Sequence, residues 1–417
     1  MQLVTMRLVA LVLMMFAVAA CDLTPPVAPD DPPAATAAPG DEAPADPAPA
    51  DEAPSDPVPD DEAPAAPPAA APAEGYLSAD GARLVDAAGE TVRLTGINWF
   101  GLETSNCAPH GLWQINLRDS MQQMADLGFN TLRLPFATAC IEEGATANGI
   151  NAQANPDLVG LSPIEIMDTV IETAGDLGMK VFLDRHALER DNRTNLWYND
   201  TYSEERWISD WVMLAQRYAG NATVIGADLH NEPYDEACWG CGDPALDWQA
   251  AAERAGNAIL EVNPDWLIIV EGVEESPAGN NWWGGNLSEA GAVPVELSNP
   301  AKLVYSPHEY ATSVFRQEWF DAADFPDNLP GIWDTFWGYL VDEEIAPLIV
   351  GEFGTTLEAT EDQQWLAELM AYMDAKGISW TFWSWNPNSG DTGGILNDDW
   401  TTINEETYGF LKPSLAP

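Results

Sequence analysis

The main part of the chain alternates between two hydrophobic patterns. Short runs of consecutive apolar residues are typical of strands buried on both faces, and apolar residues spaced three or four positions apart are typical of helices. The expected strands span 92–100, 131–136, 180–186, 224–231, 267–272, 303–310, 347–353 and 378–385. The expected helices between them span 112–128, 162–178, 203–219, 244–262 and 358–375. Eight strands alternating with helices predict an α/β protein with a (β/α)8 TIM barrel. A doubly wound open sheet is the alternative, but no glycine-rich phosphate loop follows the first strand.

Polar and aromatic residues gather at the carboxyl ends of these expected strands. In a (β/α)8 barrel those ends meet at one face, where active sites lie. The residues at the ends are Asn98, Trp99 and Glu103, then Arg133, then Asp184 and His186, then His230, Asn231 and Glu232, then Glu271, then His308 and Tyr310, then Glu352, and finally Trp383 and Trp385. Three of the four histidines of the chain are among them. A lone buried histidine is usually structural, but this clustering favours a functional site.

Two glutamates are the most informative of these residues, because each ends an apolar run. Glu232 lies just beyond the apolar run at 224–227, and Pro233 prevents that strand from continuing. Glu352 follows a second apolar run at 348–350. Two carboxyl groups at the ends of separate strands suit a pair that cleaves a glycosidic bond. For either glutamate alone, a charged residue on a surface loop is an equally good interpretation.

The first twenty residues form an apolar segment whose only charge is Arg7. It is too short for a membrane-spanning helix and has the flanks of an export signal, with Met1 or Met6 as its start. The segment ends Val-Ala-Ala-Cys at 18–21, which resembles the signal for cleavage before a lipid-modified cysteine. We therefore expect 1–20 to be a lipoprotein-type signal peptide and Cys21 to be lipidated. An ordinary secretory signal with an incidental cysteine is the alternative.

Residues 21–74 are expected to be a disordered linker that begins with the lipidated cysteine. Proline, alanine and acidic residues dominate it, and Asp-Glu-Ala-Pro recurs at 41–44, 51–54 and 61–64. Such a composition has almost no apolar surface to bury, and proline with like-charge repulsion keeps a chain extended. The expected arrangement is a catalytic or binding domain at 75–417, tethered by its linker to the bacterial envelope or surface, with release into the medium as the alternative.

The charge balance excludes one class of partner. The chain has 67 acidic and 16 basic side chains. Nucleic-acid binding needs basic residues to neutralise phosphates, so no nucleic acid is expected as a partner. The 18 tryptophans are unusually many, and exposed tryptophans are suitable platforms for sugar rings.

The cysteines other than Cys21 are even in number, which favours disulfides in an exported chain. Cys238 and Cys241 lie three positions apart. They are half of a possible zinc site, but no second close pair of ligands accompanies them, so a small disulfide loop is preferred. Cys107 and Cys140 are then the remaining pair.

The strand-end residues resemble a known family. Asn-Glu-Pro at 231–233 and Gly-Glu-Phe-Gly at 351–354 resemble the retaining glycosidases of clan A. The fuller set resembles glycoside hydrolase family 5, and comprises Arg133, His186, Asn231, Glu232, His308, Tyr310, Glu352 and Trp383. The segments 96–101, 237–244 and 389–396 further resemble bacterial endo-β-1,4-glucanases of that family. The likeness covers essentially all of 75–413 and includes no cellulose-binding module.

The resemblance implies retaining hydrolysis of β-1,4-glucan in two steps. Glu352 is implied as the nucleophile and Glu232 as the acid/base, with carboxyl groups about 5–5.5 Å apart. Asn231 is implied to hold the sugar 2-hydroxyl. The other implied substrate contacts are Arg133, His186, His308, Tyr310 and Trp383, and further cleft candidates are Trp113, Trp282, Trp283 and Gln317, with Trp283 preferred over Trp282. This chemistry needs no metal and no cofactor, and a monomer is expected.

Two alternatives to the glucanase interpretation remain open at this point. The same catalytic pair serves hydrolysis of mannan, xylan or mixed-linkage glucan, because specificity depends on the loops. A non-catalytic, glucan-binding surface lipoprotein is the other alternative, although a pure binder has no need of paired carboxylates.

The acidity of the expected domain predicts a dependence on salt. The linker holds 13 of the acidic residues and the leader one basic residue, so 75–417 has 54 acidic and 15 basic side chains. Like charges on one surface repel and destabilise the compact state, and salt shortens the screening length from roughly 30 Å at 0.01 M to about 3 Å at 1 M. We predict that molar NaCl raises the melting temperature of 75–417 at neutral pH. A flat or falling melting temperature across a NaCl series would leave solubility as the only consequence of the acidity.

Overall fold

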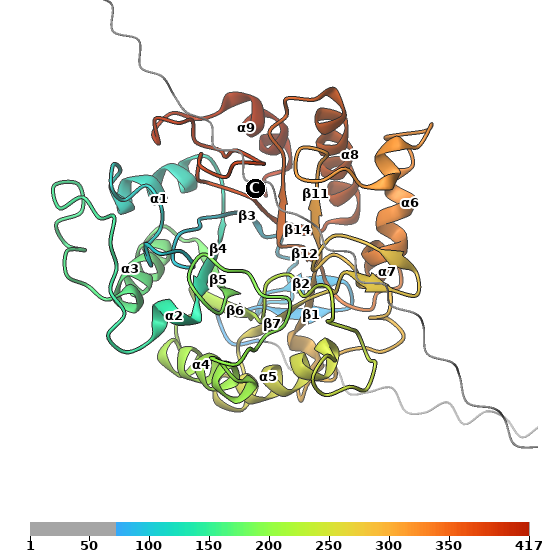
Figure 1. Ribbon diagram of the computed structural model, residues 1–417, viewed down its shortest axis with the longest axis horizontal. Coiled ribbons are helices and arrows are strands. Elements are labelled where there is room, and N and C mark those ends of the chain that lie inside the picture. Colours follow the sequence, from blue (N-terminus) through green and yellow to red (C-terminus); the bar gives the residue numbers. More distant parts are fainter. Residues whose placement is uncertain (1–71, 417) are drawn as a thin grey trace, which may run out of the picture. The chain divides into compact units, whose positions relative to one another are not determined.

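Parallel strands curl into a barrel in the computed structural model, which describes residues 72–416 (Figure 1). The hydrogen-bonded order is β10, β7, β6, β5, β4, β3, β14 and β12. The strands are β3 (Thr95–Asn98), β4 (Thr131–Ala137), β5 (Lys180–Ala187), β6 (Val224–Asp228), β7 (Leu267–Glu271), β10 (Leu303–Ser306), β12 (Ile349–Val350) and β14 (Ser379–Phe382). A parallel bridge between Tyr305 and Leu348 joins the two end strands and closes the ring. The predicted (β/α)8 barrel is therefore confirmed. The expected signal, Cys21 and most of the expected linker lie outside the described residues.

Two strands of the barrel continue beyond a break in their pairing. β10 is followed after Pro307 by β11 (His308–Tyr310), and β12 is followed after Gly351 by β13 (Glu352–Gly354). β11 and β13 pair in parallel, with His308 opposite Glu352. These extensions place two of the predicted site residues side by side at the carboxyl end of the barrel.

Helices surround the barrel (Figure 1). They are α1 (Leu117–Asp126), α2 (Thr138–Ile141), α3 (Pro163–Asp176), α4 (Glu204–Arg217), α5 (Trp248–Val262), α6 (Leu329–Trp333), α7 (Tyr339–Asp342), α8 (Thr360–Lys376) and α9 (Glu405–Leu411). Local sequence sets several of their ends. In α3, Ser162 and Glu165 form a capping box and Pro163 occupies the first turn. α8 stops at Gly377, whose φ of +66° suits a glycine.

A short hairpin closes the amino-terminal end of the barrel. β1 (Ser78–Asp80) and β2 (Arg83–Val85) pair antiparallel. Leu77 and Leu84 pack there against inward-facing strand residues that include Phe182, Ile225 and Ile269. The interior of the barrel is thus packed with apolar side chains at this end, whereas the buried acids of the predicted site lie toward the opposite end.

Both predicted disulfides are present. Cys107 in the loop after β3 is bonded to Cys140 in α2, and Cys238 is bonded to Cys241 in the loop after β6. Each bond fixes a loop at the carboxyl face of the barrel. The preference for a disulfide over a half zinc site at 238–241 is confirmed.

The structure differs from the predicted elements mainly at strand ends. The first, fourth and eighth expected strands ran to residues 100, 231 and 385, whereas β3, β6 and β14 end at Asn98, Asp228 and Phe382. The apolar and aromatic residues that prolonged the pattern are buried in loops beneath the carboxyl face. The pattern also missed the helices α2, α6, α7 and α9, because each is too short to show a clear period.

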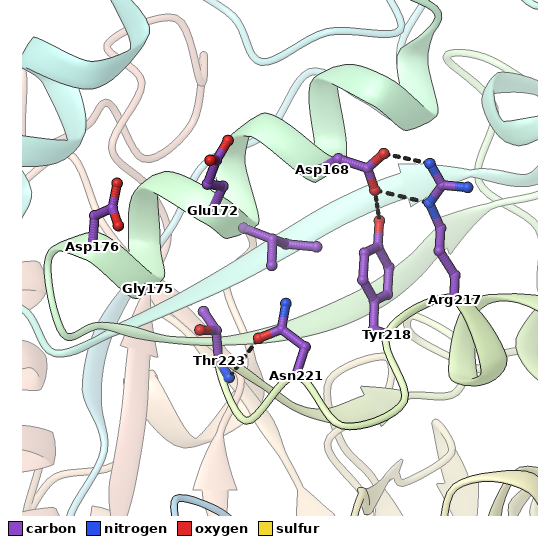
Figure 2. A pocket seen from close by; sticks show the side chains of 9 residues that line it. Asp168, Glu172, Gly175, Asp176, Arg217, Tyr218, Asn221 and Thr223 are labelled. Carbon is purple, nitrogen blue, oxygen red and sulfur yellow. Dashed lines mark hydrogen bonds and ion pairs between the residues drawn. The ribbon is translucent and has the colours of Figure 1, made fainter.

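A shallow hollow of about 590 Å³ lies at the amino-terminal side, between α3 and the end of α4 (Figure 2). Its polar groups already bind one another, since Arg217 Nε and the Tyr218 hydroxyl each donate to Asp168 at 2.8 Å. Its residues lie in α3, at the end of α4 and in the loop before β6, and none of them is at the carboxyl ends of the strands that carry the predicted site. Among residues 72–416 no helix combines the length and the apolar character needed to cross a membrane.

Candidate active site

A cleft of about 530 Å³ opens at the carboxyl ends of the strands. Its lining combines carboxylates, amides and large aromatic side chains, as expected for a sugar site. The lining residues are Arg193, Glu232, Glu274, Asn280, Asn281, Trp282, Trp283, Tyr310, Val314, Phe315, Gln317, Trp383, Asp391 and Thr392. The cleft therefore draws on loops that follow five different strands of the barrel.

The two predicted glutamates lie at the base of this cleft and face each other. Glu232 follows β6 and Glu352 begins β13, and both are buried. One carboxylate oxygen of each lies within 4.8 Å of the other and of a His308 ring nitrogen. His308 Nδ1 is 3.0 Å from Glu232 Oε1 and 3.7 Å from Glu352 Oε2. This spacing suits direct attack by one carboxylate while the other handles a proton.

A single buried guanidinium, that of Arg133 in β4, connects the charged groups beneath the cleft. It donates from Nη1 to Glu352 Oε1 at 2.5 Å, from Nε to Asp228 Oδ2 at 2.9 Å and from Nη2 to Glu271 Oε1 at 3.1 Å. Its Nη1 is also 3.1 Å from Asp184 Oδ2. All four acids and Arg133 are shielded from solvent. One cation thus faces four carboxyl groups from four strands.

The excess of buried acids over basic groups shifts the pKa values in this cluster. Burial alone would lower the pKa of Arg133, but the charges of Asp184, Asp228, Glu352 and Glu271 raise it well above its usual value. Burial raises the pKa of Asp184 and that of Asp228 to about 7, with Arg133 opposing the rise in both. Arg133 is therefore always charged, and its surrounding acids do not all ionise together near neutral pH.

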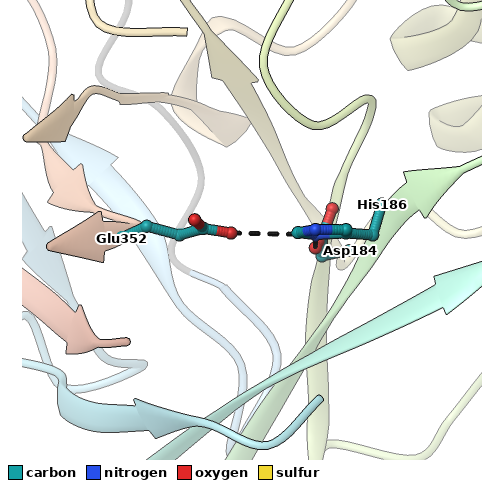
Figure 3. A group of neighbouring side chains, drawn as sticks. All are labelled: Asp184, His186 and Glu352. Atoms are coloured by element: carbon teal, nitrogen blue, oxygen red, sulfur yellow. Dashed lines mark hydrogen bonds and ion pairs between the residues drawn. The ribbon is translucent and has the colours of Figure 1, made fainter. Parts of the chain in front are cut away.

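Two histidines flank the pair of glutamates and are neutral. Burial lowers the pKa of His186 and of His308 to about 3. His186 Nδ1 is 2.8 Å from Asp184 Oδ2 and 3.7 Å from Glu352 Oε1 (Figure 3). A neutral imidazole offers one donor and one acceptor, so these rings hold the carboxyl groups without adding charge.

Tyr310 completes the surroundings of Glu352. Its hydroxyl donates to Glu352 Oε2 at 2.5 Å, on the opposite oxygen from Arg133. Burial raises the pKa of Tyr310 well above its usual value, so the hydroxyl keeps its proton. Glu352 thus receives one donor on each oxygen, which fixes the orientation of its carboxylate.

The aromatic candidates fall into two groups. Trp383 is buried and stacks between His186 and Phe100, at ring distances of 5.3 and 5.2 Å. Trp283 is 37% exposed and stacks on Tyr234, and it lines the cleft together with Gln317. Trp282 lines the cleft as well but is mostly buried.

Trp113, the remaining aromatic candidate, is not part of the cleft lining. It is equally exposed and lies in the loop after β3, against Trp400 and His110 at ring distances of 4.9 and 5.2 Å. His110 in turn contacts Phe100, so a row of rings runs from Trp383 to Trp113.

The sequence-based prediction left several members of the site without a role. Asp228 and Glu271 end buried strands and Asp184 lies within β5, and a charge within an apolar strand is the signal that identifies them. Arg193 was missed altogether, although its Nη1 lies 3.4 Å from Glu232 Oε2. It comes from the irregular loop between β5 and α4, where no periodic pattern exists. His230, by contrast, lies beside Arg185 and Trp248 and not in the cleft lining.

The side chains that could bind a metal ion are those of the acids and histidines already described in the site. Within the described residues, three sets lie close enough to share an ion, namely Asp184 with His186 and Glu352, Glu232 with His308 and Glu352, and Asp184 with Asp228 and Glu271. Arg133 contacts a member of each set and supplies positive charge to the cluster.

Comparison with known proteins places this geometry in a family. A protein-family model described as cellulase (glycosyl hydrolase family 5) matches residues 85–389. An endoglucanase of Paenibacillus polymyxa is 49% identical over 354 residues, which are 84% of this chain and 89% of that protein. The major extracellular endoglucanase of Xanthomonas campestris pv. campestris is 41% identical over 352 residues, 82% of this chain and 72% of that protein.

Solved structures agree with the sequence matches. A cellotetraose complex of the endocellulase from Pyrococcus horikoshii superposes with a TM-score of 0.78 at 42% identity, covering 83% of this chain and all of that one. The catalytic domain of the Xanthomonas endoglucanase gives the same TM-score at 40% identity, covering 81% and 99% of the two chains. The chain belongs to glycosyl hydrolase family 5, the cellulase family.

Proposed function

We propose that this protein is an endo-β-1,4-glucanase that cleaves cellulose-type chains with retention of configuration. The observation that carries the proposal is the approach of the Glu232 and Glu352 carboxylates to within 4.8 Å at the base of an aromatic cleft. The endoglucanase relatives and the cellotetraose bound by the structural relative support the substrate class.

In the first step Glu352 acts as the nucleophile. Arg133 and Tyr310 hold its two oxygens, so one of them is directed at the anomeric carbon. As the bond from Glu352 to that carbon forms, the glycosidic bond breaks, and Glu232 gives its proton to the leaving oxygen. The leaving part of the glucan departs with a new hydroxyl group. The other part stays bound through its anomeric carbon, as an ester of Glu352.

In the second step Glu232 acts as a base. It removes a proton from a water molecule, and the resulting oxygen attacks the anomeric carbon as the ester bond to Glu352 breaks. Glu352 is released as a carboxylate and Glu232 is again protonated. His308, 3.0 Å from Glu232, keeps the acid/base side chain in position through both steps.

Other cleft residues have roles in binding the sugar. Asn231 is oriented by Arg133, which donates to its Oδ1 at 3.0 Å, and within residues 72–416 its buried Nδ2 has no hydrogen-bond partner. A substrate 2-hydroxyl would satisfy this group, and such a bond strengthens in the transition state. Trp383 would form the floor under the sugar at the cleavage point, while Trp283 and Gln317 contact sugars further along. Trp113 would contact only a longer chain.

The polysaccharide preference is tested directly with a panel of soluble substrates. Release of reducing ends from carboxymethylcellulose should exceed release from mannan, xylan and mixed-linkage glucan. A stronger response to any of the other three would replace cellulose as the substrate while keeping the mechanism. Binding without any release would leave the non-catalytic alternative.

The location of the enzyme is also proposed from sequence. We infer that Cys21 becomes a lipidated amino terminus and that the acidic segment 22–74 tethers a monomeric enzyme to the bacterial envelope. The Val-Ala-Ala-Cys segment at 18–21 and the composition of the linker support this arrangement.

Replacing the nucleophile should abolish turnover. We predict that Glu352→Gln lowers kcat on carboxymethylcellulose by roughly four to six orders of magnitude while cellotetraose still binds, since the shape is kept and the nucleophile is lost. The exposed Glu358→Gln in the following loop is the matched control and should be unaffected. Turnover by Glu352→Gln close to that of the wild type would refute the assignment.

The acid role of Glu232 predicts a dependence on the leaving group. Glu232→Gln should lose about 10²- to 10⁴-fold in kcat/KM on cellotetraose, and far less on 2,4-dinitrophenyl β-cellobioside, whose leaving group needs no proton. Glu236→Gln, an exposed carboxylate four residues on, serves as control. Equal losses on the two substrates would show that Glu232 is not the acid.

The lipid anchor predicts a change of location without a change of catalysis. Cys21→Ser should move the enzyme from the membrane fraction to the soluble fraction and leave its specific activity unchanged. Fractionation followed by activity measurement checks both points. A variant that stays in the membrane fraction would place the anchor elsewhere.

A further inference from the structure

Glu271 is a buried acid that takes no part in the proposed chemistry but contacts both the acid/base Glu232 and its neighbour His308. It ends β7 and is fully shielded from solvent. Its Oε2 accepts the backbone N–H of Glu232 at 2.7 Å. Its Oε1 accepts from Arg133 Nη2 and lies 3.3 Å from His308 Nε2. Both oxygens therefore face donors that belong to the active site.

The backbone contact matters because Glu232 has an unfavourable conformation. Its φ is +51°, in the left-handed region that side chains other than glycine rarely adopt. Such a residue costs roughly 1–3 kcal/mol and persists only where its surroundings hold it. The next residue, Pro233, has no N–H, so the Glu232 N–H is the last backbone donor before the turn. The hydrogen bond from the Glu232 N–H to Glu271 therefore stabilises the strained backbone of Glu232.

Gly284 provides the space for this contact. It has a φ of +68°, and a Cβ at this position would collide with Glu271 Oε2 and lie 3.2 Å from the Cα of Glu232. The loop that carries Gly284 also donates from its N–H to the Pro233 carbonyl at 3.4 Å. The glycine thus lets three segments meet at the acid/base.

The second contact reaches the Glu232 side chain through His308. The ring lies between the two acids, with Nε2 toward Glu271 and Nδ1 toward Glu232. Because burial keeps this imidazole neutral, it carries one ring hydrogen. With its ring hydrogen on Nε2, 3.3 Å from Glu271 Oε1 but short of hydrogen-bond geometry within residues 72–416, the imidazole leaves its Nδ1 lone pair to accept the proton of Glu232. That is the arrangement required while Glu232 waits as an acid.

We propose that Glu271 is a positioning residue that holds Glu232 ready to protonate the leaving group, through its backbone N–H and through His308. The inference rests on the proposed function, in which Glu232 is the acid/base. It assigns to Glu271 a role distinct from that of Asp228, which contacts Arg133 but neither Glu232 nor His308 by hydrogen bond or ion pair within residues 72–416.

Glu271→Gln tests the proposal because a glutamine cannot make both contacts. Its carbonyl oxygen can accept from the Glu232 N–H or face His308 Nε2, but its amino group then presents hydrogens to the other donor. We expect kcat/KM on cellotetraose to fall at least about tenfold more than on 2,4-dinitrophenyl β-cellobioside. In the double variant with Glu232→Gln, this selectivity should equal that of Glu232→Gln alone, since both changes act on one proton transfer.

Asp228→Asn is the matched control, since it removes a buried carboxylate from Arg133 without touching Glu232. It should lower activity on the two substrates by the same factor. Equal losses on both substrates in Glu271→Gln, or no loss, would overturn the proposal, as would the same selectivity in Asp228→Asn. Failure of the proposed function is distinguishable, because Glu232→Gln itself would then show no selectivity.

A second variant covers the case in which Glu271→Gln does not fold, as judged by circular dichroism. Gly284→Ala approaches the same contact from the opposite side, displacing Oε2 while keeping the carboxylate. It should show the same selectivity for the activated substrate. A folded Gly284→Ala variant with equal losses on the two substrates would also overturn the proposal.

Discussion

The active site depends on one buried arginine. Arg133 binds carboxyl groups from β5, β6, β7 and β13 and orients Asn231 as well. Loss of one partner of a buried ion pair leaves an uncompensated charge and typically costs about 3–5 kcal/mol. The guanidinium therefore fixes the ends of strands that are separate in sequence, and it does so directly beneath the reacting groups. Arg133 is at once the centre of the polar end of the barrel and a donor to the proposed nucleophile.

The excess of carboxyl groups around Arg133 has a chemical consequence. With one cation and four acids, some protons must be retained near neutral pH, and burial raises the pKa of Asp184 and Asp228 to about 7. Glu352 is the acid with the shortest bond to Arg133 and with a second donor from Tyr310. The cluster thus combines a carboxylate held by two donors with buried neighbours whose pKa values are raised. Neutral His186 and His308 complete this cluster without adding charge.

The sequence predicted the fold and the meeting of Glu232 and Glu352 at one face of the barrel, and the reasons are physical. Buried parallel strands must be apolar on both faces, so Val224–Ala227 and similar apolar runs predicted strands. Glu232 was identified because it is a charged residue just beyond such a run. The predicted disulfides followed from an even number of cysteines. Strand ends were placed too late because residues such as Trp385 are buried in loops and read as strand. The supporting roles of Glu271 and Arg193 were not predictable. That of Glu271 depends on the register of β7, and that of Arg193 depends on the path of the irregular loop between β5 and α4.

The central claim is that two carboxylates cleave the substrate by double displacement, and the configuration of the first-formed product tests it most directly. Proton nuclear magnetic resonance during cellotetraose hydrolysis distinguishes the two anomers before they interconvert. The account predicts that the β-anomer appears first at the newly formed reducing end and that the α-anomer follows only by mutarotation. Initial release of the α-anomer would mean that water attacks directly, and it would contradict the role assigned to Glu352.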